Sequence, residues 1–348
     1  MLSLPKQIEP LCNTRPTRAI GMLSGGLDST LAIQMMREQG IDVLALNFVS
    51  PFCTCSPRRA AGCHRATEVA RSLGVEIRIL SKGIEYLKIV ERPRFGTGRG
   101  INPCIDCRIY ILQKAAALMD EVGASFVVTG EVLGQRPMSQ HRQALEIIER
   151  ESGLTGRILR PLSAHLLEPT QPELDGRVDR AKLLSIHGRS RKEQLAFAQE
   201  HGVEVFGCPA GGCLLTDPLI AKRLRDVFDR CPGWDLVEAR LTTAGRHFRL
   251  RDGLKAIVGR DEPENDRLRR MAPESSWMEL GGDFKGPVMI LRGEVEEGDR
   301  PVLGRLLRHF ARKVTAAAVP VLLWRGDQST GWTATHVATL AEIEGWSL

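Results

Sequence analysis

The segment SGGLDST has residue types that could bind the phosphates of a nucleotide. Glycines allow a sharp turn that brings backbone N–H groups close to an anion, and a helix that follows adds its positive amino-terminal end. Asp28 cannot hold phosphate directly, so we assign it to Mg²⁺ or to ordering the loop. The alternative is an ordinary glycine-containing turn with a serine cap. The candidate nucleotide-binding residues of this segment are Ser24, Gly25, Gly26, Asp28, Ser29 and Thr30.

The segment does not end in the GK[ST] sequence that serves γ-phosphate transfer in P-loop enzymes, so transfer of the γ-phosphate is not the natural interpretation.

A CxxC pair is the second candidate for chemistry. NPCIDCR places Cys104 and Cys107 at the start of a predicted helix, after a glycine-rich loop. A helix amino terminus lowers the pKa of a thiol, and Arg108 adds positive charge. The pair could therefore ligate a metal, act in redox chemistry or supply a nucleophile. CPAGGC adds Cys208 and Cys213 further along the chain.

The cysteines leave two metal-site hypotheses open beside sulfur transfer. Four thiolates, from Cys104, Cys107, Cys208 and Cys213, could hold a structural zinc ion. A second group comprises Cys53, Cys55, Cys63 and His64. This second group is disfavoured as a zinc site, because Cys63 and His64 are adjacent on a predicted helix and cannot readily point together. Sulfur-transfer chemistry is the favoured hypothesis for the CxxC.

The first two-thirds of the chain alternates strand and helix patterns. Amphipathic stretches over 27–39, 58–73, 104–122 and 190–202 predict helices, and a further helix at 221–228 is expected to close this unit. Apolar runs predict strands at 18–23, 41–49, 75–80, 125–130 and 157–162. Such alternation predicts a parallel sheet with helices on both faces.

The pattern changes after Cys231-Pro-Gly, which is a plausible domain boundary. Strands are predicted at 245–250 and 254–259, joined by a hairpin turn at Asp252-Gly253. Further strands are expected at 287–292 and 320–325, and a basic amphipathic helix at 302–314. This part reads as a small α+β domain.

Composition sets broad limits on the function. The chain has 348 residues, 43% of them hydrophobic and 26% charged, and a formal charge of +6. The excess of positive charge mildly favours a polyanionic partner such as nucleic acid. No apolar run is long enough to span a bilayer, and the first residues lack a signal-peptide core. We therefore expect a cytoplasmic protein that has no membrane partner.

Several motifs in order resemble one enzyme group. SGGLDST resembles the loop of the PP-loop ATP pyrophosphatases, which split ATP between the α- and β-phosphates. TGEVLGQRPMSQ (129–140) and ILRPLSAH (158–165) resemble tRNA 4-thiouridine synthetases, and NPCIDCR and GGCLL resemble tRNA 2-thiouridylases. RHFRLRDGLKAIVGRDEPENDRL resembles the RNA-binding domain of NFACT proteins.

The resemblance implies a fold and a set of ATP contacts. It implies a doubly wound parallel sheet of the PP-loop (adenine nucleotide alpha hydrolase-like) type, followed by a smaller α+β domain. The expected ranges are 1–17 for an extension, 18–230 for the PP-loop domain and 236–348 for the NFACT-like domain. ATP contacts are expected at Ser24, Gly25, Gly26, Asp28 and Ser29, with Gly130 and Gln135 near the adenylate or target base.

The implied activity is ATP-dependent thiolation of a tRNA uridine, with Asp28, Cys104, Cys107 and Cys213 as catalytic residues. Three thiolates, Cys104, Cys107 and Cys213, are expected to hold a [4Fe–4S] cluster, with Cys208 as a substitute ligand. Zinc, or a cysteine persulfide without metal, is the alternative. Classical 4-thiouridine synthetases carry RNA-binding modules before this domain and some carry a rhodanese domain after it; neither is recognised here.

The sequence leaves the sulfur donor open between sulfide and a cysteine desulfurase, and it leaves a homodimer open. Two rival functions remain: a PP-loop ligase or amidotransferase that adds nitrogen to an activated carbonyl, and a non-enzymatic RNA-binding protein.

Overall fold

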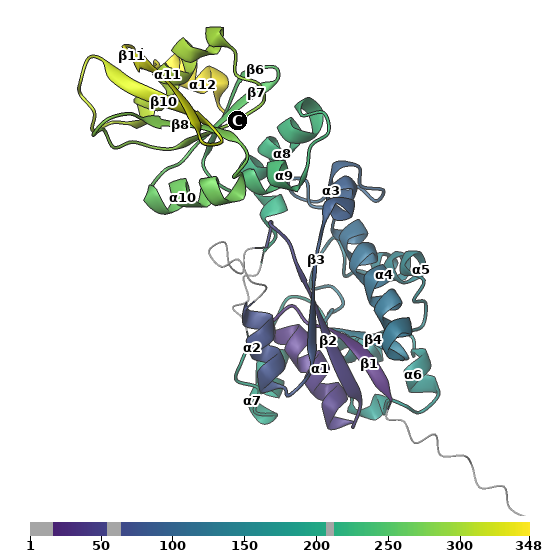
Figure 1. Ribbon diagram of the computed structural model, residues 1–348. Helices are drawn as coiled ribbons and strands as arrows, with labels where there is room; N and C mark the ends of the chain where they lie inside the picture. Colours follow the sequence, from purple (N-terminus) through teal and green to yellow (C-terminus); the bar gives the residue numbers. More distant parts are fainter. Residues whose placement is uncertain (1–16, 54–63, 207–211) are drawn as a thin grey trace, which may run out of the picture. The chain divides into compact units, whose positions relative to one another are not determined.

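The computed structural model describes residues 17–53, 64–206 and 212–348 (Figure 1). The chain forms two compact units. Among the described residues, the first comprises 17–49, 64–80 and 105–206, and the second comprises 50–53, 81–104 and 212–348. In the described part of the chain, no helix is long and apolar enough to cross a membrane.

The first unit is built on a five-stranded sheet in the order β3-β2-β1-β4-β5. The pairings β1–β2, β1–β4 and β4–β5 are parallel. The strands are β1 (Arg18–Met22), β2 (Asp42–Val49), β3 (Ile77–Ser81), β4 (Phe126–Thr129) and β5 (Ile158–Leu159). All five fall within the predicted strand ranges or one residue beyond them.

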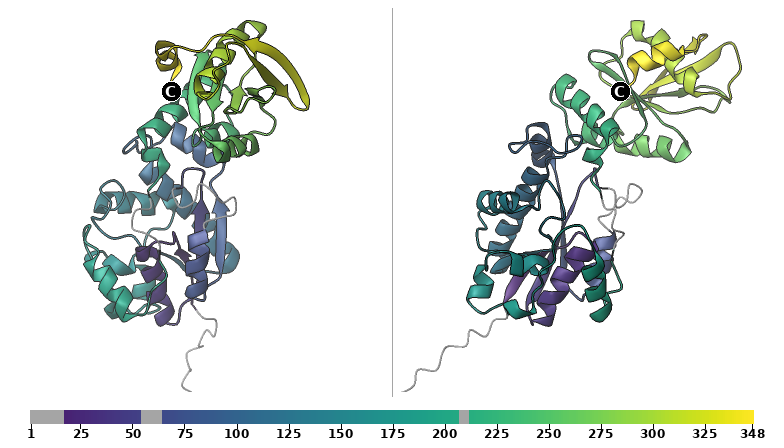
Figure 2. Two further views of the ribbon diagram at one scale, coloured as in Figure 1. Left: turned by 90° about the vertical axis from the view of Figure 1, so that its left-hand side faces the viewer. Right: turned by 180° about the vertical axis from the view of Figure 1, so that it is seen from behind.

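Helices cover both faces of this sheet. α1 (Leu27–Glu38), α2 (His64–Ser72) and α7 (Lys192–Glu200) share one apolar core with the strands. Figures 1 and 2 show α4 (Cys104–Val122) and α5 (Arg142–Ser152) on the other side of the sheet. The expected doubly wound α/β architecture is confirmed.

Strand order fixes where a ligand can bind in such a sheet. From β1 the chain proceeds to β2 and β3 on one side, and later to β4 and β5 on the other. The strand order therefore reverses between β1 and β4, and in open parallel sheets ligands bind outside the carboxyl ends of strands at such a point. In the register of these strands Met22 lies opposite Thr129, so the segments that follow β1 and β4 emerge side by side.

Local sequence explains several differences from the expected elements. The strand expected at 157–162 ends at Leu159, because Pro161 begins the 3₁₀ helix η1 (Pro161–Leu166). The helix expected at 58–73 is described from His64, and its earlier part lies outside the described residues. Short elements that periodicity did not reveal are α3 (Ile84–Glu91), α5, α6 (Gln171–Leu174) and η2 (Arg180–Lys182).

The second unit contains a six-stranded sheet in the order β11-β10-β8-β9-β7-β6, with antiparallel pairings. Its strands are β6 (Arg246–Arg251), β7 (Leu254–Val258), β8 (Ser276–Leu280), β9 (Met289–Arg292), β10 (Val319–Arg325) and β11 (Gln328–Ala334). The Asp252-Gly253 hairpin is present, with Gly253 at φ +79°. β8 and β11 were not predicted.

Two apolar cores lie against this second sheet. One includes α11 (Arg300–Phe310), with partly buried side chains of α12 (Leu340–Trp346) packed against it, and the other includes α9 (Leu236–Leu241) and α10 (Glu262–Met271). Two 3₁₀ turns, η3 (Leu214–Thr216) and η4 (Glu297–Asp299), complete the unit. The expected smaller α+β domain is thus observed.

The helix expected to close the first unit belongs to the second. α8 (Pro218–Arg230) carries Asp226, whose carboxylate lies 2.6 Å from Arg249 and 3.3 Å from Lys255 of the β6–β7 hairpin. These compact units are divided differently from the ranges 18–230 and 236–348, which remain predictions about sequence modules.

Candidate active site

The SGGLDST segment connects β1 to α1 and is ordered by its own hydroxyl groups. Ser29 Oγ donates to Gly26 O at 2.9 Å and lies 3.0 Å from Ser24 Oγ. Thr30 Oγ1 also donates to Gly26 O, at 2.9 Å. Gly25 has φ +78°, a conformation that favours glycine. The first-turn N–H groups of α1 have no partner within the helix, so this turn is able to receive an anion.

Gly130 lies directly against this loop. A Cβ atom at Gly130 would be 2.4 Å from the backbone nitrogen of Ser29 and from the carbonyl carbon of Asp28. Any side chain would therefore displace the phosphate loop. This contact explains on steric grounds why the segment after β4 begins with glycine.

Gln135 also reaches the phosphate loop. Its Nε2 donates to Asp28 Oδ2 at 3.1 Å, while Asp28 Oδ1 is buried without a hydrogen-bond partner. An unpartnered buried carboxylate oxygen beside an anion loop fits a Mg²⁺ ion, which prefers oxygen ligands and substrate phosphates. Asp28 and Gln135, both expected site residues, are thus in contact.

Arg65 is a cation beside the loop that sequence reasoning missed. It lies in the first turn of α2 and is exposed, and a Cβ at Gly25 would be 3.0 Å from its Cγ. In the described part of the chain it makes no ion pair. Arg65 lies within the helix predicted at 58–73, and nothing in that sequence pattern indicates that it contacts the phosphate loop.

A buried charge cluster supports the segment after β4. Glu131 Oε2 accepts from Arg160 Nε at 3.1 Å, and its Oε1 lies 3.4 Å from Arg108 Nε. Burial alone would raise the pKa of Glu131, but Arg108 and Arg160 more than offset it and hold that pKa below its usual range. The charge of Arg108, expected to act on the CxxC thiols, is therefore engaged by Glu131.

The rest of this segment is held by hydrogen bonds that its backbone groups make. Leu133 N donates to Ser163 Oγ at 3.0 Å, and Leu133 O accepts from Gly188 N at 2.8 Å. Gly134 N donates to Gln140 O at 2.7 Å, which closes the turn that contains Gln135. Gln135 is therefore presented to Asp28 by a well-anchored loop.

Cys104 and Cys213 are brought into one neighbourhood within the second unit. Ile101 N, just before Cys104, donates to Leu215 O at 3.0 Å, just after Cys213. Gly100, at φ +72°, permits this contact because a Cβ there would be 2.3 Å from Leu215 O. Asn102 Nδ2 lies 3.1 Å from Cys104 Sγ and donates to it.

Cys53 is a further cysteine in this neighbourhood. It pairs with Cys213 in an isolated antiparallel bridge, in which Leu214 N donates to Phe52 O at 2.9 Å. That bond flanks the pair rather than joining it, so Cys53 and Cys213 form a non-hydrogen-bonded pair, the kind with the closer side chains. The sequence groups Cys53 with Cys55, Cys63 and His64, but Cys55 and Cys63 lie outside the described residues.

Cys107 lies three residues after Cys104 in the first turn of α4, so the two share a helix face. Cys208 lies outside the described residues. Within 17–53, 64–206 and 212–348, no group of three or more His, Cys, Asp or Glu residues could hold a metal ion. The described residues alone therefore do not form a metal site at these cysteines.

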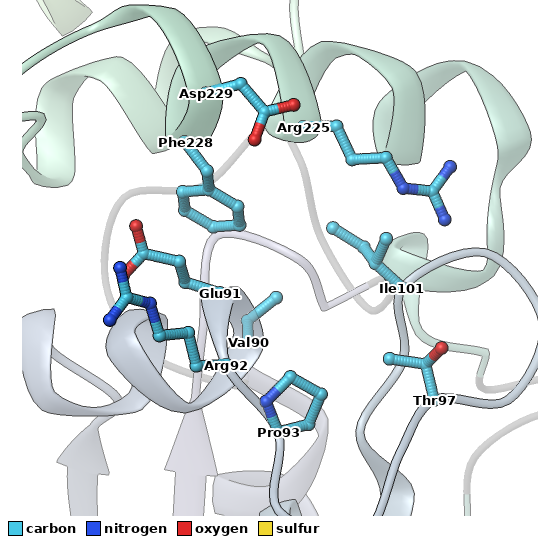
Figure 3. A pocket seen from close by; sticks show the side chains of 9 residues that line it. All are labelled: Val90, Glu91, Arg92, Pro93, Thr97, Ile101, Arg225, Phe228 and Asp229. Carbon is cyan, nitrogen blue, oxygen red and sulfur yellow. The ribbon is translucent and has the colours of Figure 1, made fainter.

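A pocket of about 330 Å³ opens within the second unit, between α8 and the segment that follows α3 (Figure 3). Its lining combines acidic, basic and apolar side chains, and it includes none of the expected site residues. The lining residues are Val90, Glu91, Arg92, Pro93, Thr97, Ile101, Arg225, Phe228 and Asp229.

Comparison with known proteins divides the chain into two matched segments. Residues 15–165 match the family model described as thiamine biosynthesis protein (ThiI). Residues 245–347 match the model described as NFACT protein RNA binding domain.

Among curated proteins, the bifunctional protein NifU/MnmA of Rubrobacter xylanophilus is 26% identical over 295 residues, which cover 79% of this chain and 56% of that protein. The tRNA-specific 2-thiouridylase MnmA of Dichelobacter nodosus is 24% identical over 310 residues, 82% of this chain and 73% of that protein. The chain thus spans about half the length of the first of these relatives.

A solved 4-thiouridine synthetase–RNA complex with bound ATP aligns with a TM-score of 0.36 and 22% identity, over 65% of this chain and 53% of that chain. On the two family matches, residues 15–165 are similar to the ThiI family, and residues 245–347 are similar to the NFACT RNA-binding domain.

Proposed function

We propose that this protein is an ATP-dependent tRNA sulfurtransferase that adenylates a uracil carbonyl oxygen, releases pyrophosphate and replaces that oxygen with sulfur. The observation that carries the proposal is the contact of Gly130 and Gln135 with Asp28 at the point where the strand order reverses. This geometry joins the phosphate loop to a second, anchored loop that could present the reacting base.

The adenylation step uses groups of the first unit. The turn over Ser24–Ser29 and the amino terminus of α1 would bind the phosphates, and Arg65 would offset their charge. Mg²⁺ on Asp28 would neutralise the triphosphate as pyrophosphate leaves. The uracil oxygen attacks the α-phosphorus, so the bond between the α- and β-phosphates breaks. The oxygen then becomes part of an AMP leaving group.

The sulfur step uses cysteines. A sulfur nucleophile delivered at Cys104, Cys107 and Cys213 would attack the activated ring carbon, and AMP would leave with the original oxygen. We propose a [4Fe–4S] cluster on these three thiolates, because a persulfide route resolved as a disulfide needs only two cysteines. Cys208 is the substitute ligand in this proposal, and sulfide or a cysteine desulfurase is the external donor.

The test is the full-length protein with unmodified tRNA, ATP, Mg²⁺ and sulfide under anaerobic conditions. Pyrophosphate release that depends on tRNA, followed by thiouridine in digested nucleosides by mass spectrometry, is the expected result. Pyrophosphate release without a thionucleoside, unaffected by Cys213→Ala, would favour addition of nitrogen instead. No pyrophosphate release with tRNA would favour an RNA-binding protein without activity.

The cluster has its own readout. Anaerobically purified protein should contain iron and acid-labile sulfide, and Cys104→Ala, Cys107→Ala and Cys213→Ala should each lose most of both. A colourless protein with stoichiometric zinc would contradict the cluster. Full thiolation by Cys104→Ala would instead support the persulfide route.

A further inference from the structure

Four basic residues lie on the β6–β7 hairpin, Arg246, Arg249, Arg251 and Lys255, and the last three pair with acidic side chains of the second unit. Arg249 and Lys255 both pair with Asp226, and Lys255 is buried. Arg251 pairs with Asp299 and Glu296. These side chains hold α8 and η4 against the hairpin, so a phosphate would have to compete with existing ion pairs.

A second set of arginines gathers nearby with few acidic partners. Arg223 Nη2 and Arg260 Nη2 donate to the same oxygen, Gly245 O, at 3.1 and 3.0 Å. Arg246 Nη1 donates to Gly259 O at 3.3 Å, and its guanidinium lies over the ring of Phe310, 4.9 Å from the centroid. Arg267 Nη2 donates to Thr243 Oγ1 at 2.9 Å. Together with Arg312, which is close enough to repel Arg246, we call these residues the Gly245 arginine cluster.

Positive charge exceeds negative charge in this cluster, although Glu264, Asp261 and Asp217 lie close enough to act on its arginines. In the described part of the chain, its ion pair is that of Arg260 with Glu264, at 3.4 Å. Burial, and then the positive charge of Arg260, lower the pKa of Arg246. The same two causes lower the pKa of Arg223 to about 10. Guanidinium groups that repel one another are stabilised by an added anion.

Exposure shows where such an anion could enter. Arg223 is buried, Arg246 and Arg267 are half-buried, and Arg260 and Arg312 are exposed. The buried backbone contacts fix the orientation of the guanidinium groups, while the exposed ones face solvent. Planar guanidinium groups bind phosphate oxygens with paired N–H donors, so a preoriented set suits a phosphodiester.

We propose that the Gly245 arginine cluster is the site at which the second unit binds the sugar-phosphate backbone of RNA. The proposal rests on tRNA as the substrate in the function proposed above, and it identifies the residues that hold it. Backbone binding of this kind positions RNA without reading its sequence, and it releases counterions from the phosphates.

The test compares full-length Arg260→Gln, Arg312→Gln and the double variant with wild type. The measurement is the dissociation constant for unmodified tRNA over a range of salt concentrations. Each lost phosphate contact should reduce the slope of log K against log salt by about 0.7 to 0.9, and weaken binding several-fold at low salt. The double variant should show about twice the single effect.

Arg270→Gln is the matched control. Arg270 is exposed in the last turn of α10, and the substitution removes one positive charge outside the cluster. Thermal unfolding checks that every variant is folded. Equal slopes for Arg270→Gln and the double variant would overturn the proposal. A wild-type protein that binds tRNA but releases no pyrophosphate would refute the proposed activity. The phosphate site would still be tested separately, by the change in the slope of log K against log salt.

Discussion

Gln135 Nε2 donates a 3.1 Å hydrogen bond to Asp28 Oδ2, across a separation of 107 residues in the chain. The bond joins the loop after β4 to the loop after β1, and parallel pairing of these strands makes it possible. The other oxygen of Asp28 is buried without a partner. Asp28 therefore faces a protein donor on one side and has an acceptor left for a cation.

Asp28→Asn should remove pyrophosphate release while the protein stays folded. The amide keeps an oxygen near Gln135 but loses the charge that Mg²⁺ requires, so we expect a loss of about 100-fold or more in rate, the scale on which electrostatic stabilisation acts. Pyrophosphate release with tRNA and circular dichroism are the measurements. Normal release by the folded variant would remove the role given to Asp28.

Gly130→Ala should disable the phosphate loop. A methyl group 2.4 Å from the backbone of Asp28 and Ser29 forces that backbone to move, at about 1–3 kcal/mol in unfolding free energy. ATP binding should weaken at the same time, measured by calorimetry. Gly83→Ala is the control, because nothing lies within 4 Å of its Cβ position and its φ is −86°.

Arg65→Gln should raise the KM for ATP by about tenfold, the effect of one charge-assisted contact worth roughly 1.4 kcal/mol. The Arg65 side chain passes Gly25 and is exposed, so its loss should not disturb the fold. Arg71→Gln, in the last turn of the same helix, is the control. An unchanged KM would show that Arg65 points away from the triphosphate.

Sequence patterns were most informative where structure is periodic and local. The five strands of the first sheet and the helices α1 and α4 were predicted, because apolar runs and helical spacing record burial directly. β8 and β11 were not, since β11 is largely exposed and β8 mixes charged and apolar residues. The placement of α8 was also missed, because its amphipathic pattern shows that one face is buried but not which sheet that face packs against.

The candidate site shows the same division. The glycines and hydroxyls of the phosphate loop could be identified from their types, and Gly130 and Gln135 only through a family resemblance. Arg65, Glu131 and Arg160 were missed, because their roles arise from contacts between segments that are distant in the chain. The basic residues of the β6–β7 hairpin can be read from the sequence. The ion pairs of Arg249 and Lys255 with Asp226 on α8 cannot.

Glu131→Gln should destabilise the first unit by about 1–3 kcal/mol at neutral pH, because it removes the buried charge that pairs with Arg160 and Arg108 and leaves Glu149 to pair with Arg160. The folded pKa of Glu131 lies below the ordinary 4.5, so its stabilising effect is complete above about pH 4.5. That effect is lost as the pH falls from 4.5 through the folded pKa. The difference in unfolding free energy between wild type and variant should therefore shrink below pH 4.5.

Chemical denaturation at several pH values measures this difference. Glu121→Gln is the control, because its ion pair with Arg78 is exposed and should contribute little. A difference that stays constant down to pH 3 would contradict a depressed pKa for Glu131.

Oxidation should link Cys53 to Cys213. The two residues form a non-hydrogen-bonded antiparallel pair, for which Cα atoms are about 4.5 Å apart, within the range that a disulfide spans. Treatment of the metal-free, folded protein with diamide should give a peptide that contains both cysteines, identified by mass spectrometry. Cys231, which is also in the second unit, should not link to Cys53.

If Cys213 has a sulfur-transfer role, the cross-link should also stop thiolation, and dithiothreitol should restore it. Recovery of Cys213 linked to a different cysteine, or of no link at all in the folded protein, would show that this pairing does not bring the two thiols together.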